Sequence, residues 1–371
     1  MMKKKCFFFL TIIPLLIMIL YYKFFKKKSD IINFINAKIH PKSIVIFEIN
    51  PHHYECLPGY TKYFTDLGYH VDIIMRKNKR ESMERFEPKN KIRMFEYNNI
   101  QEIKNNLEKY KKKILLYNYS LLHTTDINPI FKELGYYDNP NSLFIIHAID
   151  YLNELKLDDF IKKKHAFSLA DYGVLIYVNP NYFGNFNLSH NKNNKTKTSF
   201  FITSSINRNY SQLIDGLNYI KEKNIDFELN VIGHGNTFNP EKVPKDLLKY
   251  FHFHLRVKYQ KMYEIVQKSD FIIINLFPDN EMNNLFRTTR ATGSIQLSYG
   301  FYKPVIIEEN FAPIYKLTNE TSITFQLHDM RKALEKAATM TNEDYIKMSK
   351  NMKILKDTIY NTSLNNIKKV L

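Results

Sequence analysis

The strongest constraint on the fold is a stretch in which two short apolar segments enclose a helix-like one. The first segment, Phe271 to Phe277, is bounded by turn residues and predicts a strand buried on both faces. Gly293 and Ser294 open the next helix, where free backbone N–H groups and the helix dipole favour an anion. Lys303 and Pro304 end that helix and precede a second buried strand. A strand, an anion-binding helix start and a strand in this order suit the diphosphate of a nucleotide.

Apolar runs of the same kind alternate with helix-like segments in two series. They are continuous rather than alternating, as a parallel sheet covered on both faces requires. The predicted strands are Ser43–Ile49, His70–Met75, Ile92–Tyr97, Ile114–Tyr119, Ser142–Ile149, Gly173–Val178, Ser199–Ile206, Phe227–Ile232, Tyr250–Val257, Phe271–Phe277, Pro304–Ile307 and Ser322–Leu327. The predicted helices include Tyr60–Leu67, Ile100–Lys112, Tyr210–Lys223 and Tyr259–Gln267. We therefore expect an α/β protein with two doubly wound, Rossmann-like sheets that face each other across a cleft.

The polar stretch from Asn185 to Lys197 reads as the linker between the two series. It separates an N-terminal domain at residues 42–184 from a C-terminal domain at residues 198–340. A C-terminal helix at residues 341–371 follows, with Thr341 and Asp344 as a capping pair at its start.

The first 28 residues form a separate unit. Residues Cys6 to Tyr22 are an uncharged run of 17 residues, flanked by Lys3, Lys4, Lys5, Lys23, Lys26, Lys27 and Lys28. No small-residue cleavage site follows the run, so a single-pass membrane anchor is favoured over a signal peptide. Similar lysine numbers on both sides leave its orientation open, with the cytoplasmic face favoured.

Charge and motif content exclude several functions. The net charge is +17, but the Lys and Arg residues are scattered and form no nucleic-acid-binding module. Binding to an anionic membrane surface or to a nucleotide phosphate accounts for the excess of positive charge. The sequence lacks a D-x-D triplet, a P-loop, a G-x-S-x-G elbow and any Cys/His cluster with zinc spacing. Cys6 and Cys56 provide no disulfide framework. No metal site is expected.

Polar residues follow several predicted strands of the C-terminal half. The loop from Thr203 to Arg208 carries an arginine, whose fork matches phosphate oxygens. Gly233, His234 and Gly235 form a tight turn in which backbone can approach a ligand. Thr292 precedes Gly293 and Ser294 as a potential helix cap, and Glu308 and Glu309 end a strand where a carboxylate suits a ribose diol. Each feature has a structural alternative: a solvated arginine, an ordinary turn, a capped helix or an exposed loop.

These motifs resemble the donor-binding half of GT-B-fold glycosyltransferases of families 1 and 4. The resemblance covers most of the chain after residue 42 and is strongest over residues 199–310. It implies that Arg208, Gly233, His234, Thr292, Gly293 and Ser294 bind a nucleotide-sugar diphosphate and that Glu308 binds the ribose. The chain departs from family 4 because the E-x7-E signature is absent; Arg287 and Arg290 lie in that region as possible diphosphate ligands.

The N-terminal half carries side chains suited to proton transfer. His52, His53 and Glu55 follow the first predicted strand, and His147 and Asp150 follow another. Histidine and glutamate exchange protons near neutral pH when their pKa values are tuned. The resemblance places both groups on the acceptor side of the cleft. Polar loop residues, or Asp150 as a helix cap, are the structural alternatives.

Together these features predict a membrane-anchored, metal-independent glycosyltransferase. It takes a nucleotide-diphosphate sugar as substrate, needs no further cofactor, and transfers the sugar to a glycan, lipid or protein-linked acceptor. A catalytically inactive GT-B-like scaffold or partner subunit tethered to the membrane is the alternative, because of the missing signature. A sugar-nucleotide epimerase of related fold is a third possibility.

Overall fold

The structure is a computed structural model of the full chain. It describes residues 37–48, 53–97, 114–119, 139–149, 166–192, 196–205, 208–233, 238, 240–327 and 329–371, and of residues 114–119 only the backbone. The predicted helix Ile100–Lys112 and the apolar run from Cys6 to Tyr22 lie outside these residues, as do His52, Asp150 and His234. Within the described part of the chain, no helix is long and apolar enough to cross a membrane.

The N-terminal lobe is built on a parallel sheet of seven strands. Its order is β3-β2-β1-β4-β5-β6-β7. The strands are β1 (Ser43–Glu48), β2 (His70–Arg76), β3 (Ile92–Tyr97), β4 (Ile114–Tyr119), β5 (Ser142–Ile146), β6 (Ala166–Ser168) and β7 (Ile176–Tyr177). Every residue of β1 is buried, as its apolar sequence predicts for a central parallel strand.

The C-terminal lobe is built on a second parallel sheet, of six strands. Its order is β10-β9-β8-β11-β12-β13. The strands are β8 (Thr198–Thr203), β9 (Phe227–Gly233), β10 (Phe251–Leu255), β11 (Phe271–Ile274), β12 (Val305–Glu308) and β13 (Ser322–Phe325). In both sheets the order reverses at the first strand, which is the doubly wound arrangement.

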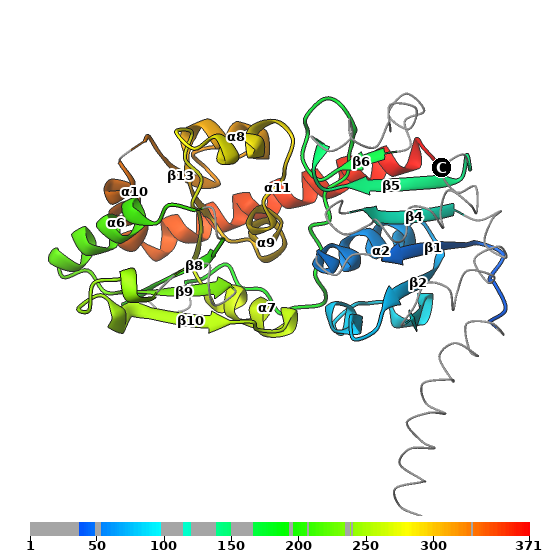
Figure 1. The fold of residues 1–371 in the computed structure, drawn as a ribbon, viewed down its shortest axis with the longest axis horizontal. Coiled ribbons are helices and arrows are strands. Elements are labelled where there is room, and N and C mark those ends of the chain that lie inside the picture. Colours follow the sequence, from blue (N-terminus) through cyan, green and yellow to red (C-terminus); the bar gives the residue numbers. More distant parts are fainter. Residues whose placement is uncertain are drawn as a thin grey trace, which may run out of the picture.

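Helices cover both faces of the C-terminal sheet (Figure 1). One apolar cluster joins the sheet to α6 (Ser211–Glu222) and α10 (Met330–Ala338). The opposite cluster joins it to α7 (Tyr259–Lys268) and α9 (Gly293–Phe301). In the N-terminal lobe, α2 (Leu57–Asp66) packs on β1 and β2. The described residues also include the helix α8 (Glu281–Thr288).

The C-terminal helix α11 (Asn342–Lys368) runs along the C-terminal lobe and crosses to the N-terminal lobe (Figure 1). Its start is capped as predicted, because the Thr341 side chain accepts a hydrogen bond from the Asp344 N–H at 3.1 Å. Met352 and Ile359 pack in the core of the C-terminal lobe, whereas Ile367 is fully buried in the core of the N-terminal lobe.

Polar contacts of α11 reinforce this crossing. The Ser363 hydroxyl accepts a hydrogen bond from the Asn179 N–H at 3.0 Å. The Tyr360 hydroxyl donates to Asp66 at 2.5 Å, and its ring stacks on Tyr63 with centroids 4.7 Å apart. The last turns of α11 are therefore part of the N-terminal lobe.

The prediction of two parallel α/β sheets is confirmed, with local errors. The helix predicted from Tyr60 begins earlier, at Leu57, because Pro58 suits the first turn of a helix. The strand predicted to reach Phe277 ends at Ile274, so Asn275 stands at its carboxyl end. The short strand β6 and the helix α8 were not predicted.

The segment predicted as a plain polar linker is anchored by its own side chains. Phe186, within the segment, and Phe183, just before it, pack against the core of the C-terminal lobe. The Lys192 ammonium is buried and donates to the Thr198 hydroxyl at 3.0 Å and to the Met340 carbonyl at 3.2 Å.

Two isoleucines of α11 test its role in joining the lobes. Ile367→Ala removes a fully buried side chain, and we expect it to lower the free energy of unfolding by about 2–5 kcal/mol. The matched control is Ile354→Ala on the same helix, where the side chain is 63% exposed and the change should stay within about 0.5 kcal/mol. Urea denaturation of both variants measures the difference. Equal losses would contradict the crossing of α11.

Candidate functional site

The C-terminal sheet has its topological switch point between β8 and β11, the position at which open α/β sheets bind ligands. Arg208 follows β8 and Asn275 follows β11, so both lie at the carboxyl edge there. The Arg208 guanidinium donates to the Asn275 carbonyl oxygen at 2.8 Å. The Asn275 amide in turn donates to the Asn209 carbonyl at 2.8 Å, which holds the two loops together.

Arg208 is a half-buried cation without a counter-ion among the described residues. No carboxylate lies within ion-pair distance of its guanidinium among the described residues; its neighbours are neutral. The Arg208 guanidinium also donates to the side-chain oxygen of Asn283 at 3.5 Å. Its central carbon lies 4.8 Å from the centre of the Phe286 ring. Burial lowers the pKa of Arg208 to about 10, so the guanidinium stays charged at neutral pH. A cation in this position favours an incoming anion.

The N-terminus of α9 offers backbone donors to the same place. The N–H groups of Gly293 and Ser294 have no acceptor among the described residues. Gly293 is exposed, and a Cβ atom added to it would meet nothing within 4 Å. The Ser294 hydroxyl bonds to the Thr203 hydroxyl at 2.6 Å, which joins α9 to the end of β8. The expectation that the Thr292 side chain caps α9 is wrong: Thr292 occupies the N-cap position but its side chain makes no capping bond.

Tyr315 connects these two features. Burial raises the pKa of Tyr315, whereas the Thr292 backbone N–H and the Arg208 charge oppose that rise. Both groups therefore lie near the Tyr315 hydroxyl, which donates to the Phe286 carbonyl at 3.1 Å. Arg208 and the start of α9 belong to one site.

The other predicted donor-side residues have different environments. Gly233 ends β9 with its carbonyl accepting from the Arg256 N–H at 2.9 Å. Glu308 is buried and accepts two hydrogen bonds from Asn310, at 2.9 and 2.8 Å. Arg287 is exposed on α8 and forms no hydrogen bond or ion pair with the described residues. Lys303, which was not predicted to bind the donor, donates to the Gln267 carbonyl at 2.9 Å and so satisfies a carbonyl in the last turn of α7.

In the N-terminal lobe, the loop after β1 forms a histidine–carboxylate pair. His53 Nδ1 and Glu55 Oε1 are 3.2 Å apart, and half of the His53 side chain (50%) is exposed. Burial lowers the pKa of His53, but the hydrogen bond to Glu55 and the charges of Glu55 and Glu48 outweigh it and raise the value above 6.5. A partly exposed imidazole oriented by a carboxylate is suited to general base catalysis.

Glu55 remains ionised in this pair. Burial opposes its ionisation, but the His53 bond, the His53 charge and the Tyr259 hydroxyl lower the pKa of Glu55 to about 2. Tyr259 is the first residue of α7 and belongs to the C-terminal lobe. Its ring contacts Tyr54 edge to face, with centroids 4.6 Å apart. Tyr259 was not predicted, because nothing in its sequence context marks a contact with the other lobe.

His147 lies beside the pair at the carboxyl end of β5. Its ring centroid is 5.0 Å from that of His53. Burial and then the neighbouring His53 charge lower the pKa of His147 to about 3. His147 is therefore neutral at physiological pH and too weak a base to accept a proton from an alcohol.

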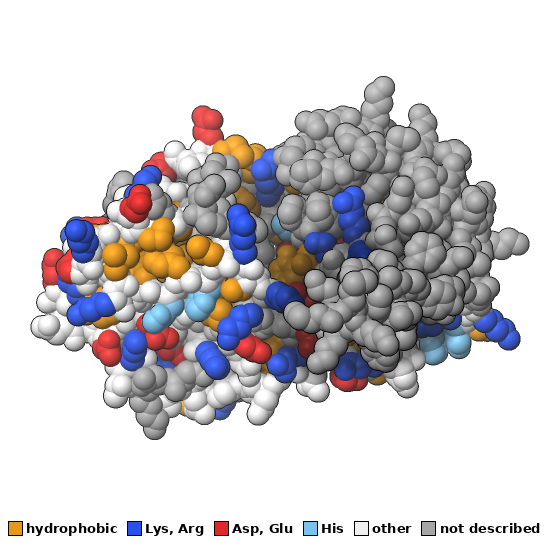
Figure 2. All heavy atoms as spheres, turned by 60° about the horizontal axis from the view of Figure 1, so that its bottom comes forward, with side chains coloured by type: hydrophobic (Ala, Val, Ile, Leu, Met, Phe, Trp, Pro, Cys, Tyr) orange, Lys and Arg blue, Asp and Glu red, His pale blue; other side chains and the backbone are white. Residues whose placement is uncertain are grey.

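The two lobes touch on both sides of these residues. On one side, Gln260 of α7 binds Glu81 through its backbone N–H at 3.0 Å and its side-chain amide at 2.9 Å. On the other, Ala148 and Arg290 form an antiparallel bridge, and the Ile149 N–H donates to the Thr289 carbonyl at 2.9 Å. Arg290 thus reaches the N-terminal lobe through its backbone. Figure 2 shows Lys and Arg side chains along the border between the lobes.

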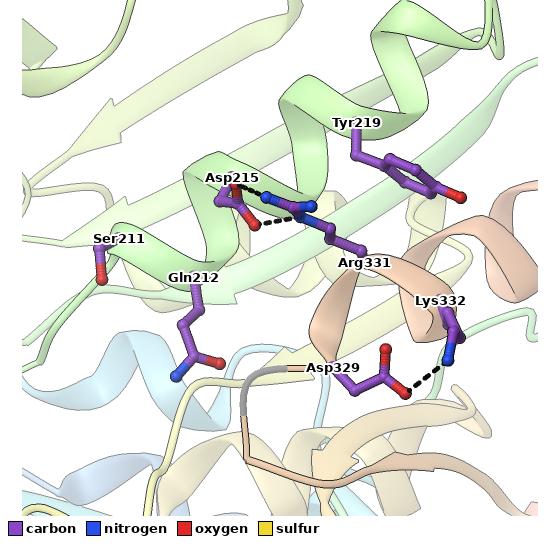
Figure 3. A pocket seen from close by; sticks show the side chains of 7 residues that line it. All are labelled: Ser211, Gln212, Asp215, Tyr219, Asp329, Arg331 and Lys332. Atoms are coloured by element: carbon purple, nitrogen blue, oxygen red, sulfur yellow. Dashed lines mark hydrogen bonds and ion pairs between the residues drawn. The ribbon is translucent and has the colours of Figure 1, made fainter.

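A separate hollow of about 700 Å³ lies between α6 and α10, at the end of the C-terminal lobe away from the other lobe (Figures 1 and 3). Figure 3 shows its charged side chains paired with one another: Arg331 with Asp215, and Lys332 with Asp329. These pairs leave little charge for a ligand, so the candidate site stays at the switch point.

Comparisons with known proteins identify the fold. No known family profile and no curated protein matches the sequence. HepE of Anabaena, solved with UDP and glucose, matches with a TM-score of 0.52 and 9% identity over 88% of this chain and 99% of that chain. The spinosyn forosaminyltransferase SpnP matches with a TM-score of 0.49 and 11% identity over 88% and 97%.

TarM of S. aureus matches with a TM-score of 0.48 and 13% identity over 74% of this chain, which spans 58% of the TarM chain. HepE, with the higher score, matches over nearly its full length. Two doubly wound sheets, a C-terminal helix shared by both lobes and the match to HepE show that this chain has the GT-B fold.

Proposed function

We propose that the protein is a metal-independent glycosyltransferase that takes a nucleotide-diphosphate sugar as donor. The observation that carries this proposal is Arg208, a half-buried cation at the switch point of the C-terminal sheet, with no carboxylate partner among the described residues. The unpaired N–H groups of Gly293 and Ser294 supply further donors beside it. HepE, solved with UDP and glucose, has the same fold.

In this proposal the departing diphosphate is stabilised by fixed charge and dipoles. Arg208 and the start of α9 are held in place before any ligand arrives, so they need no reorganisation when negative charge develops on the leaving oxygen. The Arg208 fork suits two phosphate oxygens at once. Arg287 and His234 remain candidate ligands of the same diphosphate, and Gly233 leaves room for backbone to approach the nucleotide.

Glu308 has a defined place in this proposal. Its carboxylate already accepts two bonds from Asn310 and is fixed at the end of β12. A carboxylate oxygen accepts more than one hydrogen bond, so a ribose hydroxyl can be added to the pair.

The acceptor hydroxyl loses its proton to His53 in the proposed reaction. Glu55 fixes the ring through Nδ1, which leaves Nε2 to take the proton. Glu55 also stabilises the imidazolium that forms. His147 contributes as a neutral hydrogen-bonding group, and His52 and Asp150 remain candidates from the sequence. The alternative of an inactive scaffold is disfavoured by the tuned pKa values of His53 and Glu55.

We also propose that residues 1–28 anchor the enzyme to a membrane on the cytoplasmic side. The 17-residue apolar run and its seven flanking lysines support this. A glycan or glycolipid acceptor then reaches the cleft near the bilayer surface.

Arg208→Gln tests the donor site. Loss of the guanidinium removes charge-assisted bonds to the diphosphate, and we expect binding of the preferred nucleotide among UDP, GDP and ADP to weaken at least about tenfold. Calorimetry measures it. Arg256→Gln, an exposed arginine of the same lobe, is the control and should bind as wild type. If the wild-type protein binds none of the three nucleotides, the scaffold alternative replaces the enzyme.

The pH dependence of kcat/KM tests the base. Activity requires neutral His53, so it should fall as the pH drops below the raised pKa of His53. In Glu55→Gln the bond and charge that raise this pKa are lost while burial remains, so the acid limb should move to lower pH and the rate should drop. Glu84→Gln, an exposed carboxylate of the same lobe, should keep the wild-type profile. If the acid limb of the kcat/KM profile stays at the same pH in Glu55→Gln, His53 is excluded as the base.

Deletion of residues 1–28 tests the anchor. The full chain should sediment with membranes and resist extraction by high salt, because apolar insertion does not depend on ionic strength. The truncated protein should be released into the supernatant with its nucleotide affinity intact. A truncated protein that still sediments and resists salt would place the membrane contact elsewhere.

A further inference from the structure

A basic pocket lies at the amino edge of the N-terminal sheet, opposite the edge that carries the proposed base. It has a volume of about 380 Å³ and lies between the segment before β1 and the starts of β2 and β3. Figure 1 shows the start of β1 at the end of the N-terminal lobe away from the other lobe. The proposed reaction gives this pocket no role. Its charged and imidazole side chains are those of Lys38, His40, His70, Asp72, Lys91 and Arg93.

The negative charge in the lining is already neutralised. Asp72 is the only carboxylate among the lining residues, and its side chain is buried. The Arg93 guanidinium donates to both of its oxygens at 2.7 Å. Arg93 also donates to the Lys38 carbonyl at 2.9 Å, which ties the segment before β1 to β3. The charge that remains in the pocket is therefore positive.

Two lysines carry this remaining charge. The Lys91 ammonium donates to the Thr65 carbonyl at 3.0 Å, in the last turn of α2. This contact helps to cap α2, but a neutral carbonyl leaves the net charge of Lys91 in place. The Lys38 side chain is exposed and forms no hydrogen bond or ion pair with the described residues. Lys38 thus has no structural contact to explain its place in the lining.

Two histidines show that the field in the pocket is positive. The rings of His40 and His70 lie side by side, with centroids 3.8 Å apart. Burial lowers the pKa of His70, and the charges of His40 and Lys91 lower it further. Arg93 acts in the same direction and has a larger effect on His70 than its partner Asp72. An anion in the pocket would relieve this repulsion between like charges.

The pocket lies where the proposed membrane anchor joins the lobe. Lys38 follows Lys28, the last of the lysines that flank the apolar run, by ten residues. Ten fully extended residues span at most about 35 Å, so the pocket stays near the bilayer surface when the run is inserted. Figure 2 shows histidine and basic side chains together at this end of the lobe.

We infer that this pocket binds the headgroup phosphate of an anionic phospholipid in the membrane that holds the anchor. The inference rests on the proposed function, because it takes residues 1–28 as that anchor. Lys38 and Lys91 supply charge to the phosphate, and the rings of His40 and His70 supply N–H donors. The contact turns the amino edge of the sheet toward the bilayer and leaves the carboxyl edge open to substrates.

Acetylation of Lys38 in the full chain tests the pocket. The protein is placed in bilayer nanodiscs of phosphatidylcholine alone or of an equal mixture with phosphatidylglycerol, and mass spectrometry follows the acetylation of single lysines. Lys38 should react at least about fivefold more slowly in the anionic nanodiscs, which is the effect of one lysine contact with an anionic lipid surface. Lys245, exposed on the other lobe, should react equally in both. Equal reactivity of Lys38 in the two nanodiscs overturns the pocket, and this comparison needs no variant.

A matched pair of variants separates the pocket from general surface charge. Lys91→Gln removes a charge from the lining and should restore most of the Lys38 reactivity in the anionic nanodiscs. Lys89→Gln removes the same charge two residues away, outside the lining, and should keep Lys38 protected. Equal protection of Lys38 in the two variants overturns the pocket. Unchanged thermal midpoints confirm that both variants fold.

Further arms distinguish the source of the phosphate and the failure of the anchor. Inorganic phosphate that protects Lys38 to the same degree in phosphatidylcholine nanodiscs would replace the lipid by a soluble anion. A full chain that does not enter phosphatidylcholine nanodiscs overturns the anchor. In that case the chain is mixed with phosphatidylglycerol vesicles: protection of Lys38 supports the pocket, and its absence overturns the pocket as well.

Discussion

The relation between the two lobes depends on α11, which is part of both hydrophobic cores. Met352 and Ile359 are buried in one core and Ile367 in the other, so the helix cannot leave either lobe without exposing apolar surface. This holds the carboxyl edges of both sheets toward each other. Arg208 and His53 come from different sheets, and both can serve one reaction only if that relation is kept.

The clearest indication of a ligand site in this protein is a positively charged side chain that has no carboxylate partner among the described residues. Two buried lysines of the described residues have structural roles: Lys303 donates to the Gln267 carbonyl in the last turn of α7, and Lys192 donates to the Thr198 hydroxyl. Among the described residues, Arg208 contacts only neutral groups and follows the end of β8. Folding gains little from a desolvated, unpaired guanidinium, so its retention points to a ligand.

The sequence was sufficient to predict both sheets, because each parallel strand is a continuous apolar run such as Ile44 to Phe47. It also placed Arg208, Gly293 and the His53–Glu55 pair at strand ends, where ligands of open sheets bind. The partners of these residues were not predictable. Tyr259 reaches Glu55 only through the packing of α7 on the other lobe.

The missing E-x7-E signature has a structural counterpart in α8. This helix stands between β11 and α9, where the resembling family 4 enzymes carry their two glutamates. Here Asn283 and Phe286 of α8 contact Arg208, and the turn after it bridges to the other lobe at Ala148. The segment therefore positions a cation instead of supplying carboxylates.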